Sequence, residues 1–313
     1  MKAIRLFLTL SFSLITILSS TYVTGGNAPA PVAAHDDGTV YILAIGNSFT
    51  HDSVRDYFHG FTNADGKKVV VGFMYIPGCS LERHLTNARE DKPDYEFWKS
   101  DTEGNYSSTK SSRLSEVIPS ERWDYIVFQQ QSGLSGVYQS YEESLPELVE
   151  YTKGLAANPD VTYVFHMTWA YASDFGSERF GRYGYDKLRM YNAITDATYR
   201  GVRLVGINLI IPSGTAIQNG RTSPVGDNFC RDGYHLHHGI GRFTAAATWY
   251  AALFGKVASD NTYNPANLTP IDIAIGKKAA DYAVSRPFEI TAMDSAAYPA
   301  AYRVPVAVPS ARQ

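Results

Sequence analysis

The chain has 313 residues, 44% of them hydrophobic, and a formal net charge of −3 at pH 7. This length and apolar content suffice for one sizeable α/β domain with a small appendage, and not for two equal domains. Lys and Arg are scattered along the chain. We therefore expect no basic patch and no nucleic-acid partner.

The first residues carry the pattern of an export signal. Lys2 and Arg5 precede an apolar run over residues 6–18, and small residues follow that run. The run is shorter than the ~20 residues that a membrane-spanning helix needs. A charged start, an apolar centre and small residues are typical of a secretory signal. We expect residues 1–25 to be a signal peptide and the mature protein to be exported, either periplasmic or secreted, with no membrane contact after removal.

A turn between a strand and a helix follows the signal region. The apolar run 39–45 predicts a buried strand, and the next residues, 46–50, read Gly-Asn-Ser-Phe-Thr. A tight turn here would lift the Ser48 hydroxyl into the crevice at the carboxyl edge of an α/β sheet. The same residues also suit an ordinary helix cap. His51 and Asp52 are expected in the first turn of the helix, where an acid complements the helix dipole.

The rest of the chain alternates between short apolar runs and amphipathic stretches. Strands are predicted at 69–75, 124–128, 161–167 and 203–208, and helices at 52–62, 140–155, 185–199, 240–254 and 271–285. Such alternation predicts a parallel sheet covered on both faces. We expect a doubly wound parallel sheet in a flavodoxin-like, three-layer α/β/α sandwich over residues 38–258. A helical appendage and a tail would follow over 259–313.

Two segments are expected as loops near the crevice. Residues 91–115 are mostly polar, and residues 169–176 come directly after a predicted strand. Long loops in compact domains tend to be functional or disordered. Their aromatic side chains are expected mainly to pack against the domain, with contact to sugar rings as the minority interpretation.

Asp232 and His235 lie just ahead of the amphipathic stretch 240–254. A serine is a weak nucleophile that needs a neighbouring base, and the base needs a third group to fix its tautomer. Because the two residues are three positions apart at a helix entrance, the carboxylate can hold the imidazole nitrogen that faces away from the serine. The pair therefore supplies a base and its orienting acid in one local unit.

Together these segments resemble the SGNH (GDSL-like) hydrolase family over roughly residues 39–254. That family places its nucleophile in a Gly-Asp-Ser or Gly-Asn-Ser turn after the first strand, matched by residues 46–48, and ends in Asp-x-x-His, matched by Asp232 and His235. Its second block supplies a glycine that helps bind the oxyanion, matched by Gly78. The resemblance implies a triad of Ser48, His235 and Asp232, with the backbone N–H groups of Ser48 and Gly78 in the oxyanion hole.

The third block of the family departs from this resemblance. Where the family has Gly-x-Asn-Asp, this chain reads Gln-Gln-Gln-Ser over residues 129–132. A glutamine amide offers the same N–H donor as asparagine on a longer arm. Plain register puts Gln131 over the asparagine, while branches that deacetylate sugars favour Gln129, and both stay open. The chain looks closest to an uncharacterised exported branch with this Gln-rich block.

The two cysteines of an exported chain invite pairing. The resemblance puts the blocks that contain Cys79 and Cys230 on one rim of the site, so a disulfide between them is expected. The alternative is two buried free thiols. His235, His237 and His238 form a dense group, but carboxylate or cysteine companions at ligand spacing are missing, so we expect neither a metal nor a cofactor.

The resemblance and the export signal together imply an exported serine esterase. Its expected substrate is an acetyl or similar small acyl ester, on carbohydrate or on another small molecule. Two alternatives belong to other classes. One is a secreted, non-catalytic carbohydrate-binding protein that retains the fold, and the other is a metal-dependent phosphoesterase that uses the histidine group. Nothing in the sequence predicts the oligomeric state.

Overall fold

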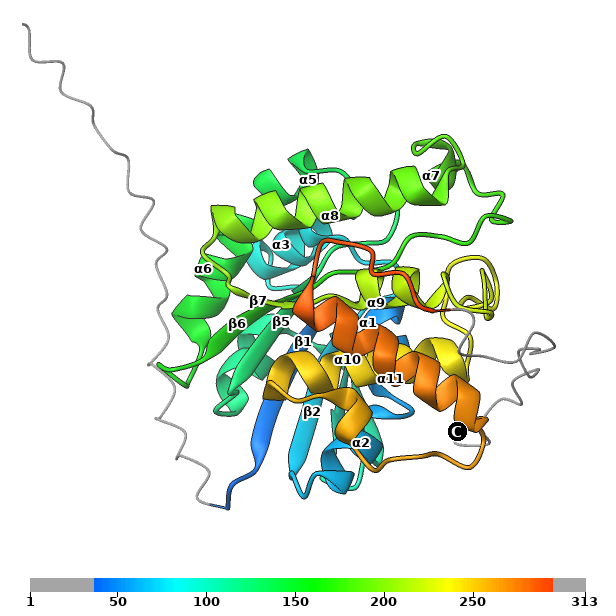
Figure 1. The fold of residues 1–313 in the computed structure, drawn as a ribbon. Helices are drawn as coiled ribbons and strands as arrows, with labels where there is room; N and C mark the ends of the chain where they lie inside the picture. The colour runs from blue at the N-terminus through cyan, green and yellow to red at the C-terminus, as the bar shows by residue number, and fades with distance from the viewer. Residues whose placement is uncertain (1–36, 295–313) are drawn as a thin grey trace, which may run out of the picture. The chain divides into compact units, whose positions relative to one another are not determined.

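A computed structural model describes residues 37–294, and a seven-stranded sheet lies at its centre (Figure 1). The strand order is β4-β3-β2-β1-β5-β6-β7. The strands are β1 (Val40–Gly46), β2 (Val69–Tyr75), β3 (Tyr95–Ser100), β4 (Tyr106–Ser112), β5 (Tyr125–Gln129), β6 (Thr162–His166) and β7 (Leu209–Ile211). Neighbouring strands among β2, β1, β5, β6 and β7 pair in parallel. Strand β3 pairs antiparallel with both β2 and β4. The predicted signal peptide, residues 1–25, lies outside the described residues.

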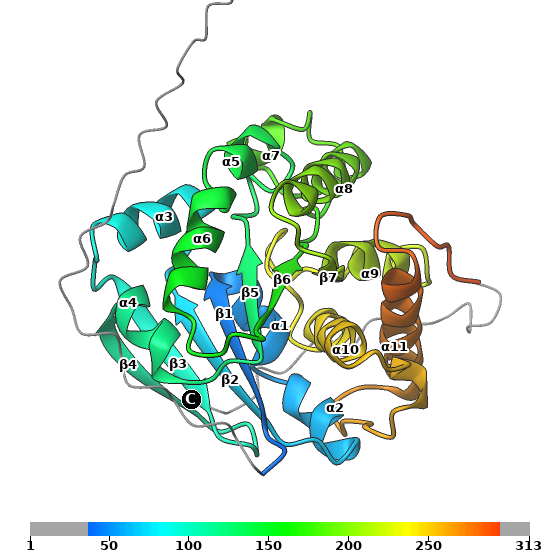
Figure 2. The same cartoon turned by 90° about the vertical axis from the view of Figure 1, so that its left-hand side faces the viewer.

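Helices cover both faces of this sheet. They are α1 (Ser48–Val54), α2 (Phe58–Ala64), α3 (Leu81–Arg89), α4 (Leu114–Val117), α5 (Gln139–Glu142), α6 (Leu145–Leu155), α7 (Glu178–Gly181), α8 (Lys187–Leu204), α9 (Ser213–Gly220), α10 (Ile240–Phe254) and α11 (Pro270–Ser285), with 3₁₀ turns at Ile118–Ser120 and Ala258–Asp260. In Figure 2, α3 and α6 lie on one side of the sheet and α10 and α11 on the other. The three-layer α/β/α architecture predicted from the sequence is confirmed.

The central strand β1 shows why the sheet is buried on both faces. Leu43 and Ile45 pack into one apolar core with residues of α3 and α6, whereas Ile42 and Ala44 pack into the other with residues of α2 and α10. All four side chains are at most 1% exposed. Successive side chains of a strand point to opposite faces, so a strand between two helical layers has to be apolar throughout.

The segment 91–115 is not the loop that its polar sequence predicts. It contains β3 and β4, an antiparallel hairpin that adds to the sheet beyond β2. The sheet is therefore mixed rather than wholly parallel. Strand β4 lies at the edge and exposes Ser107 to Ser111 to solvent, so its sequence carries no apolar alternation. Trp98 and Tyr106 of the hairpin are partly buried and hold the Arg55 guanidinium at 4.4 Å and 4.8 Å from their ring centroids.

Three predicted elements need correction. The strand predicted at 203–208 is wrong because α8 continues to Leu204 and β7 follows a turn only at Leu209–Ile211. The helix predicted over 52–62 is interrupted between α1 and α2. The helix predicted over 140–155 is likewise two helices, and Pro146 at the start of α6 has no N–H with which to continue the preceding turn.

Helix α11 folds back on the domain. Its side chains Ile275, Ala279 and Ala280 are fully buried, and the helix packs against α10 and α9. The division of the chain at residue 259 stays a prediction. Within residues 37–294, no helix is long and apolar enough to cross a membrane.

Candidate active site

Ser48 lies at the carboxyl edge of the sheet, where β1 ends and α1 begins. Asn47 has extended backbone angles and caps α1 by accepting a hydrogen bond from the N–H of Phe49 at 3.0 Å. A side chain at Gly46 would lie 2.3 Å from the Thr50 hydroxyl and 2.9 Å from the Gln129 amide oxygen. Only glycine lets the chain turn this closely over β5, and the turn leaves Ser48 half-buried at the start of α1.

Asp232 and His235 lie at the tip of a narrow loop. The N–H of Arg231 donates to the carbonyl of His235 at 2.9 Å, and that of His237 donates to the carbonyl of Phe229 at 2.8 Å. These two bonds close the base of the loop, which we call the histidine loop, residues 229–237. At its tip Gly233 has φ +86°, and a Cβ there would lie 2.5 Å from the ring of Phe175, so the turn requires glycine.

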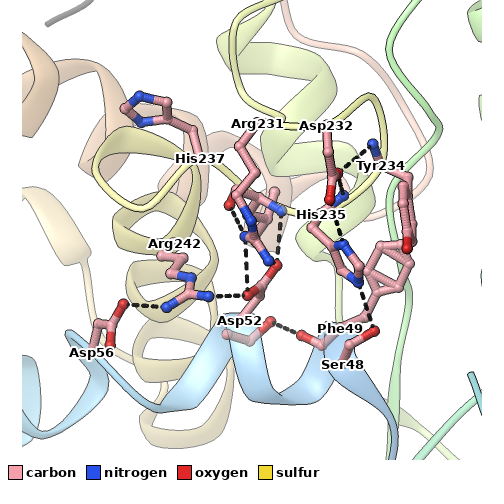
Figure 3. Close-up of polar contacts among 12 residues, drawn as sticks. Ser48, Phe49, Asp52, Asp56, Arg231, Asp232, Tyr234, His235, His237 and Arg242 are labelled. Atoms are coloured by element: carbon pink, nitrogen blue, oxygen red, sulfur yellow. Dashed lines mark hydrogen bonds and ion pairs between the residues drawn. The ribbon is translucent and has the colours of Figure 1, made fainter. Parts of the chain in front are cut away.

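The structure brings the three predicted triad residues together. His235 Nε2 lies 3.0 Å from Ser48 Oγ, across 187 residues of sequence, and His235 Nδ1 lies 2.7 Å from Asp232 Oδ2 (Figure 3). The other oxygen of Asp232 accepts the backbone N–H of His235 at 2.7 Å and of Tyr234 at 3.2 Å. The arrangement connects a hydroxyl, an imidazole and a carboxylate in that order.

Asp232 is held in its charged form by these contacts. Burial raises the pKa of its carboxyl, but the hydrogen bonds from the His235 ring, the His235 backbone and the Tyr234 backbone outweigh burial and leave the pKa below its ordinary value of 3.8. An ionised acceptor at Nδ1 requires a proton on that nitrogen. The Nε2 atom of a neutral His235 is then free to accept the Ser48 proton.

Gly78 and Ser48 both present free backbone donors at this edge. Neither N–H donates to an acceptor within residues 37–294. The second block is tied to the first because Asn47 Nδ2 donates to the carbonyl of Cys79 at 3.0 Å. Asn47 therefore fixes the start of α1 and the loop that contains Gly78 relative to each other.

The three glutamines of the third block have different partners. The amide N–H₂ of Gln129 donates to Asn47 Oδ1 at 2.8 Å and to the carbonyl of Gln130 at 3.1 Å. Its amide oxygen accepts a hydrogen bond from the Thr50 hydroxyl at 2.6 Å. Gln130 accepts the N–H groups of Leu81 and Gln131 at 3.0 Å and 2.8 Å. Both are supporting residues, and sequence reasoning gave Gln130 no role.

Gln131 differs from these two neighbours. Its oxygen accepts the N–H of Leu134 at 3.0 Å, while its Nε2 donates to no acceptor in the described part of the chain. Of the two glutamines left open by the sequence, Gln131 is thus the one whose amide hydrogens are available to a ligand.

The predicted disulfide is not formed, because Cys79 and Cys230 lie in separate packed surroundings. Cys79 Sγ is 3.5 Å from Nδ1 of His84 in the apolar core beside α3, and Cys230 Sγ is 3.6 Å from Nη2 of Arg221. Burial raises the pKa of both thiols to about 12. Cys79 and Cys230 are therefore two free thiols, which was the alternative interpretation.

Thiol titration checks this correction. We expect no reaction of Cys79 with an aromatic disulfide reagent in the native protein, because that side chain is fully buried and protonated. After denaturation without reductant, two thiols per chain should react. Fewer than two thiols, or a cross-linked Cys79–Cys230 peptide in a non-reducing digest, would contradict the structure.

His237 and His166 take no part in the hydrogen bonds of the triad. His237 points away from Ser48 in Figure 3 and accepts the N–H of Gly239 at 3.2 Å. His166 is fully buried against the Ser213 hydroxyl at 3.0 Å, and burial lowers its pKa to about 3. Among residues 37–294 no three His, Cys, Asp or Glu side chains are grouped to hold a metal ion.

The loop at 169–176 contributes packing contacts next to the site. Trp169 and Tyr171 are fully buried, as their main interpretation predicted. Trp169 Nε1 donates to the carbonyl of Tyr234 at 2.7 Å, and the Tyr234 ring lies 3.8 Å from the His235 ring, centroid to centroid. This loop therefore supports the histidine loop from behind.

One charged residue of the site was misassigned from the sequence. Asp52 was expected in the first turn of a helix, as an acid that complements the dipole, but it is the fifth residue of α1, is only 1% exposed and contacts Arg231, Arg242 and the N–H of Leu236. The available signal was its spacing, because a residue four positions after Ser48 lies on the same face of a helix.

The fold and this arrangement define an α/β protein with a Ser–His–Asp relay at the carboxyl edge of its sheet. Residues 41–283 match the family described as "Domain of unknown function (DUF4886)", and the chain belongs to that family. A crystal structure of a DUF4886 family protein from Bacteroides uniformis ATCC 8492 is 44% identical, covers 81% of this chain and 97% of that chain, and has a TM-score of 0.79.

Two more distant structures have names from the SGNH hydrolases and the esterases. A putative SGNH hydrolase from Slackia heliotrinireducens is 20% identical over 69% of this chain and 99% of that chain, with a TM-score of 0.48. An acetylxylan esterase from Geobacillus stearothermophilus, solved as a catalytic mutant, is 12% identical over 69% and 93%, with a TM-score of 0.44. Likenesses at this level assign no activity. No curated protein matches the chain.

Proposed function

We propose that this protein is an exported serine esterase that removes acetyl or similar small acyl groups, with acylated carbohydrate as its substrate class. The observation that carries the proposal is the pair of contacts made by the His235 ring. Its Nε2 lies 3.0 Å from Ser48 Oγ, and its Nδ1 lies 2.7 Å from Asp232 Oδ2. A hydroxyl, a base and an orienting acid in this order are what nucleophilic acyl transfer needs.

The first half of the reaction forms an acyl-enzyme. Ser48 Oγ attacks the ester carbonyl carbon while Nε2 of His235 takes the hydroxyl proton. The carbonyl oxygen becomes an oxyanion and accepts hydrogen bonds from the N–H groups of Ser48 and Gly78 and from the Gln131 amide. The C–O bond of the ester then breaks, and His235 returns its proton to the departing alkoxide, which leaves as a hydroxyl group of the sugar.

The second half releases the acid. His235 accepts a proton from water, the resulting hydroxide adds to the acyl carbon, and the bond from that carbon to Ser48 Oγ breaks as His235 returns the proton to Oγ. Asp232 stays ionised throughout and stabilises the imidazolium. The products are a free carboxylic acid, acetic acid in the simplest case, and the unmodified enzyme.

Export and the carbohydrate class rest on the sequence. A charged and apolar start argues for export, and the SGNH resemblance with its Gln-rich third block argues for deacetylation of sugars. Acetate release from a panel of acetylated glycans tests the substrate class, with p-nitrophenyl acetate as the general ester. Hydrolysis of the aryl ester without acetate release from any glycan would remove carbohydrate from the proposal and keep the esterase.

A secreted carbohydrate-binding protein without chemistry is the alternative outcome. The departure in the third block motivates this alternative, whereas the Gln131 Nε2 atom, which donates to no acceptor within residues 37–294, supports a competent third donor. Glycan binding with no turnover of any ester and no labelling of Ser48 by a fluorophosphonate would favour the binder.

Gln131→Ala tests the proposed third oxyanion donor. Loss of one such donor should lower kcat for p-nitrophenyl acetate by about 10²- to 10³-fold. KM should change little, because the hydrogen bond strengthens when negative charge develops. The matched control is Gln139→Ala, since Gln139 is a surface residue of α5 whose amide, in the described part of the chain, binds only Glu143 at 2.7 Å. Equal kcat values for the two variants would exclude Gln131 from the oxyanion hole.

A further inference from the structure

A second aspartate, Asp52, lies beside the proposed triad without touching it. It follows Ser48 by one turn on α1, and its side chain points toward the histidine loop rather than into solvent (Figure 3). The carboxylate is 1% exposed. A buried carboxylate is costly unless it is paired and hydrogen-bonded, so the contacts of this one define its role.

Asp52 and Arg231 together hold the residue that follows His235. Asp52 Oδ2 accepts the backbone N–H of Leu236 at 2.8 Å. Arg231 Nη1 donates to both oxygens of Asp52, at 3.2 Å and 3.4 Å, and also to the carbonyl of Leu236. Both polar backbone groups of Leu236 are therefore bound, one by the carboxylate and the other by the guanidinium that pairs with it.

Arg242 anchors the same carboxylate from a third element. Its Nη2 donates to Asp52 Oδ1 from α10, and its Nη1 donates to Asp56 Oδ2 at 2.6 Å. Burial lowers the pKa of Arg242, but the charges of Asp52 and Asp56 outweigh burial and leave it above its ordinary value. Asp52 thus ties α1, which contains Ser48, to the histidine loop and to α10.

We infer that Asp52 is a positioning residue for the proposed reaction: it docks the histidine loop on α1 through Leu236 and Arg231, and so sets the separation of His235 Nε2 from Ser48 Oγ. The expected effect on kcat rests on the proposed function. The docking of the histidine loop rests on the contacts alone. Because the base of the histidine loop is narrow, a shift of Leu236 moves His235 with it. A misplacement of ~1 Å at a reacting group can lower a rate by about 10²-fold.

A purely structural ion cluster is the competing interpretation, and two variants of similar chemistry separate it from positioning. Asp52→Asn keeps the shape of the side chain but removes the charge that holds Arg231 and Leu236. Asp56→Asn removes the other carboxylate on Arg242, and within residues 37–294 Asp56 makes no hydrogen bond or ion pair with the histidine loop. Each substitution removes one of the two carboxylates that pair with the Arg242 guanidinium.

The experiment measures kcat, KM and thermal unfolding for both variants, together with hydrogen–deuterium exchange of a peptide over 229–237. For folded Asp52→Asn, we expect kcat to fall about 10- to 100-fold with KM within about threefold, and amide exchange in 229–237 to accelerate. Asp56→Asn should keep kcat within about threefold and leave that exchange unchanged. A merely structural role would lower thermal stability without changing kcat of the folded enzyme.

Arg231→Gln provides a second variant if Asp52→Asn does not fold. The Arg231 side chain is 28% exposed, and Arg242 still pairs with Asp52 in this variant, so the buried carboxylate keeps a partner. Arg231→Gln should lower kcat and accelerate exchange in residues 229–237, as Asp52→Asn does. The two effects should be non-additive in the double variant, because both residues act through Leu236.

Wild-type kcat, or unchanged exchange over 229–237, in a folded Asp52→Asn enzyme would overturn the inference. The proposed function fails in a different way, through a wild-type enzyme that hydrolyses no ester. In that event exchange still decides the docking role of Asp52, which faster exchange in Asp52→Asn supports and unchanged exchange overturns.

Discussion

Ser48→Ala is expected to lower kcat/KM for p-nitrophenyl acetate by about 10⁴- to 10⁶-fold while the fold is retained. The substitution removes the only oxygen that His235 Nε2 contacts at 3.0 Å, and no other hydroxyl is hydrogen-bonded to that ring among the described residues. The proposed oxyanion donors remain in place in this variant, so a residual rate above that of water should persist. Steady-state kinetics at saturating and limiting substrate measure the loss.

The control for Ser48→Ala is a second serine that pairs with a histidine elsewhere. Ser213 lies 3.0 Å from His166 Nε2, but the pair is fully buried in the core. Ser213→Ala should therefore keep kcat/KM within about tenfold of the wild type and act on stability instead. Ser48→Ala activity within tenfold of the wild type, or a larger loss for Ser213→Ala, would contradict the assignment of the nucleophile.

Asp232→Asn should lower kcat by about 10⁴-fold, the second largest effect that the site predicts. An asparagine amide can donate a hydrogen bond to Nδ1 of His235, which moves the ring proton to Nε2 and leaves no acceptor for the Ser48 hydroxyl. The asparagine oxygen can still accept the N–H groups of Tyr234 and His235, as Asp232 Oδ1 does. The turn should therefore survive the substitution, and KM should change little.

Asp174→Asn is the matched control for the loss of one negative charge near the site. Asp174 is exposed on the loop between β6 and α7. Its substitution should keep kcat within about threefold. If Asp232→Asn were as active as this control, the carboxylate would have no part in orienting the imidazole.

The central residues of the site could be predicted because their geometry is local. Gly46 to Ser48 form a turn directly after a buried strand, and Asp232 reaches His235 within one loop, so short spacings fix both units. The order of the parallel strands then brings the two units to one edge of the sheet. At that edge, Ser48 Oγ and His235 Nε2 are 3.0 Å apart.

Other features depend on partners that no spacing reveals. Among the described residues, the amide groups of Gln129 and Gln130 donate to Asn47 and Ser140, which lie on other elements, whereas that of Gln131 donates to no acceptor. Likewise, Cys79 and Cys230 lie in blocks that meet at the site, yet their side chains pack into different cores. The sequence could place the blocks but could not orient these side chains.

The missed elements of the fold have simple physical causes. Strand β4 is an exposed edge with the sequence Tyr-Ser-Ser-Thr-Lys-Ser-Ser, which lacks the apolar period of a half-buried strand. Strand β7 has three residues and is too short to show a period at all. The contacts of Asp52 could not be predicted because its two arginine partners come about 180 residues later in the chain.

The location of a covalent fluorophosphonate adduct tests the central claim most directly, because this reagent reports which hydroxyl is activated by a base. Peptide mass mapping of the labelled wild-type protein should place one adduct on Ser48. The same treatment of His235→Ala should leave Ser48 unmodified. An adduct on another residue, no adduct in the wild type, or undiminished labelling of Ser48 in His235→Ala would contradict the account.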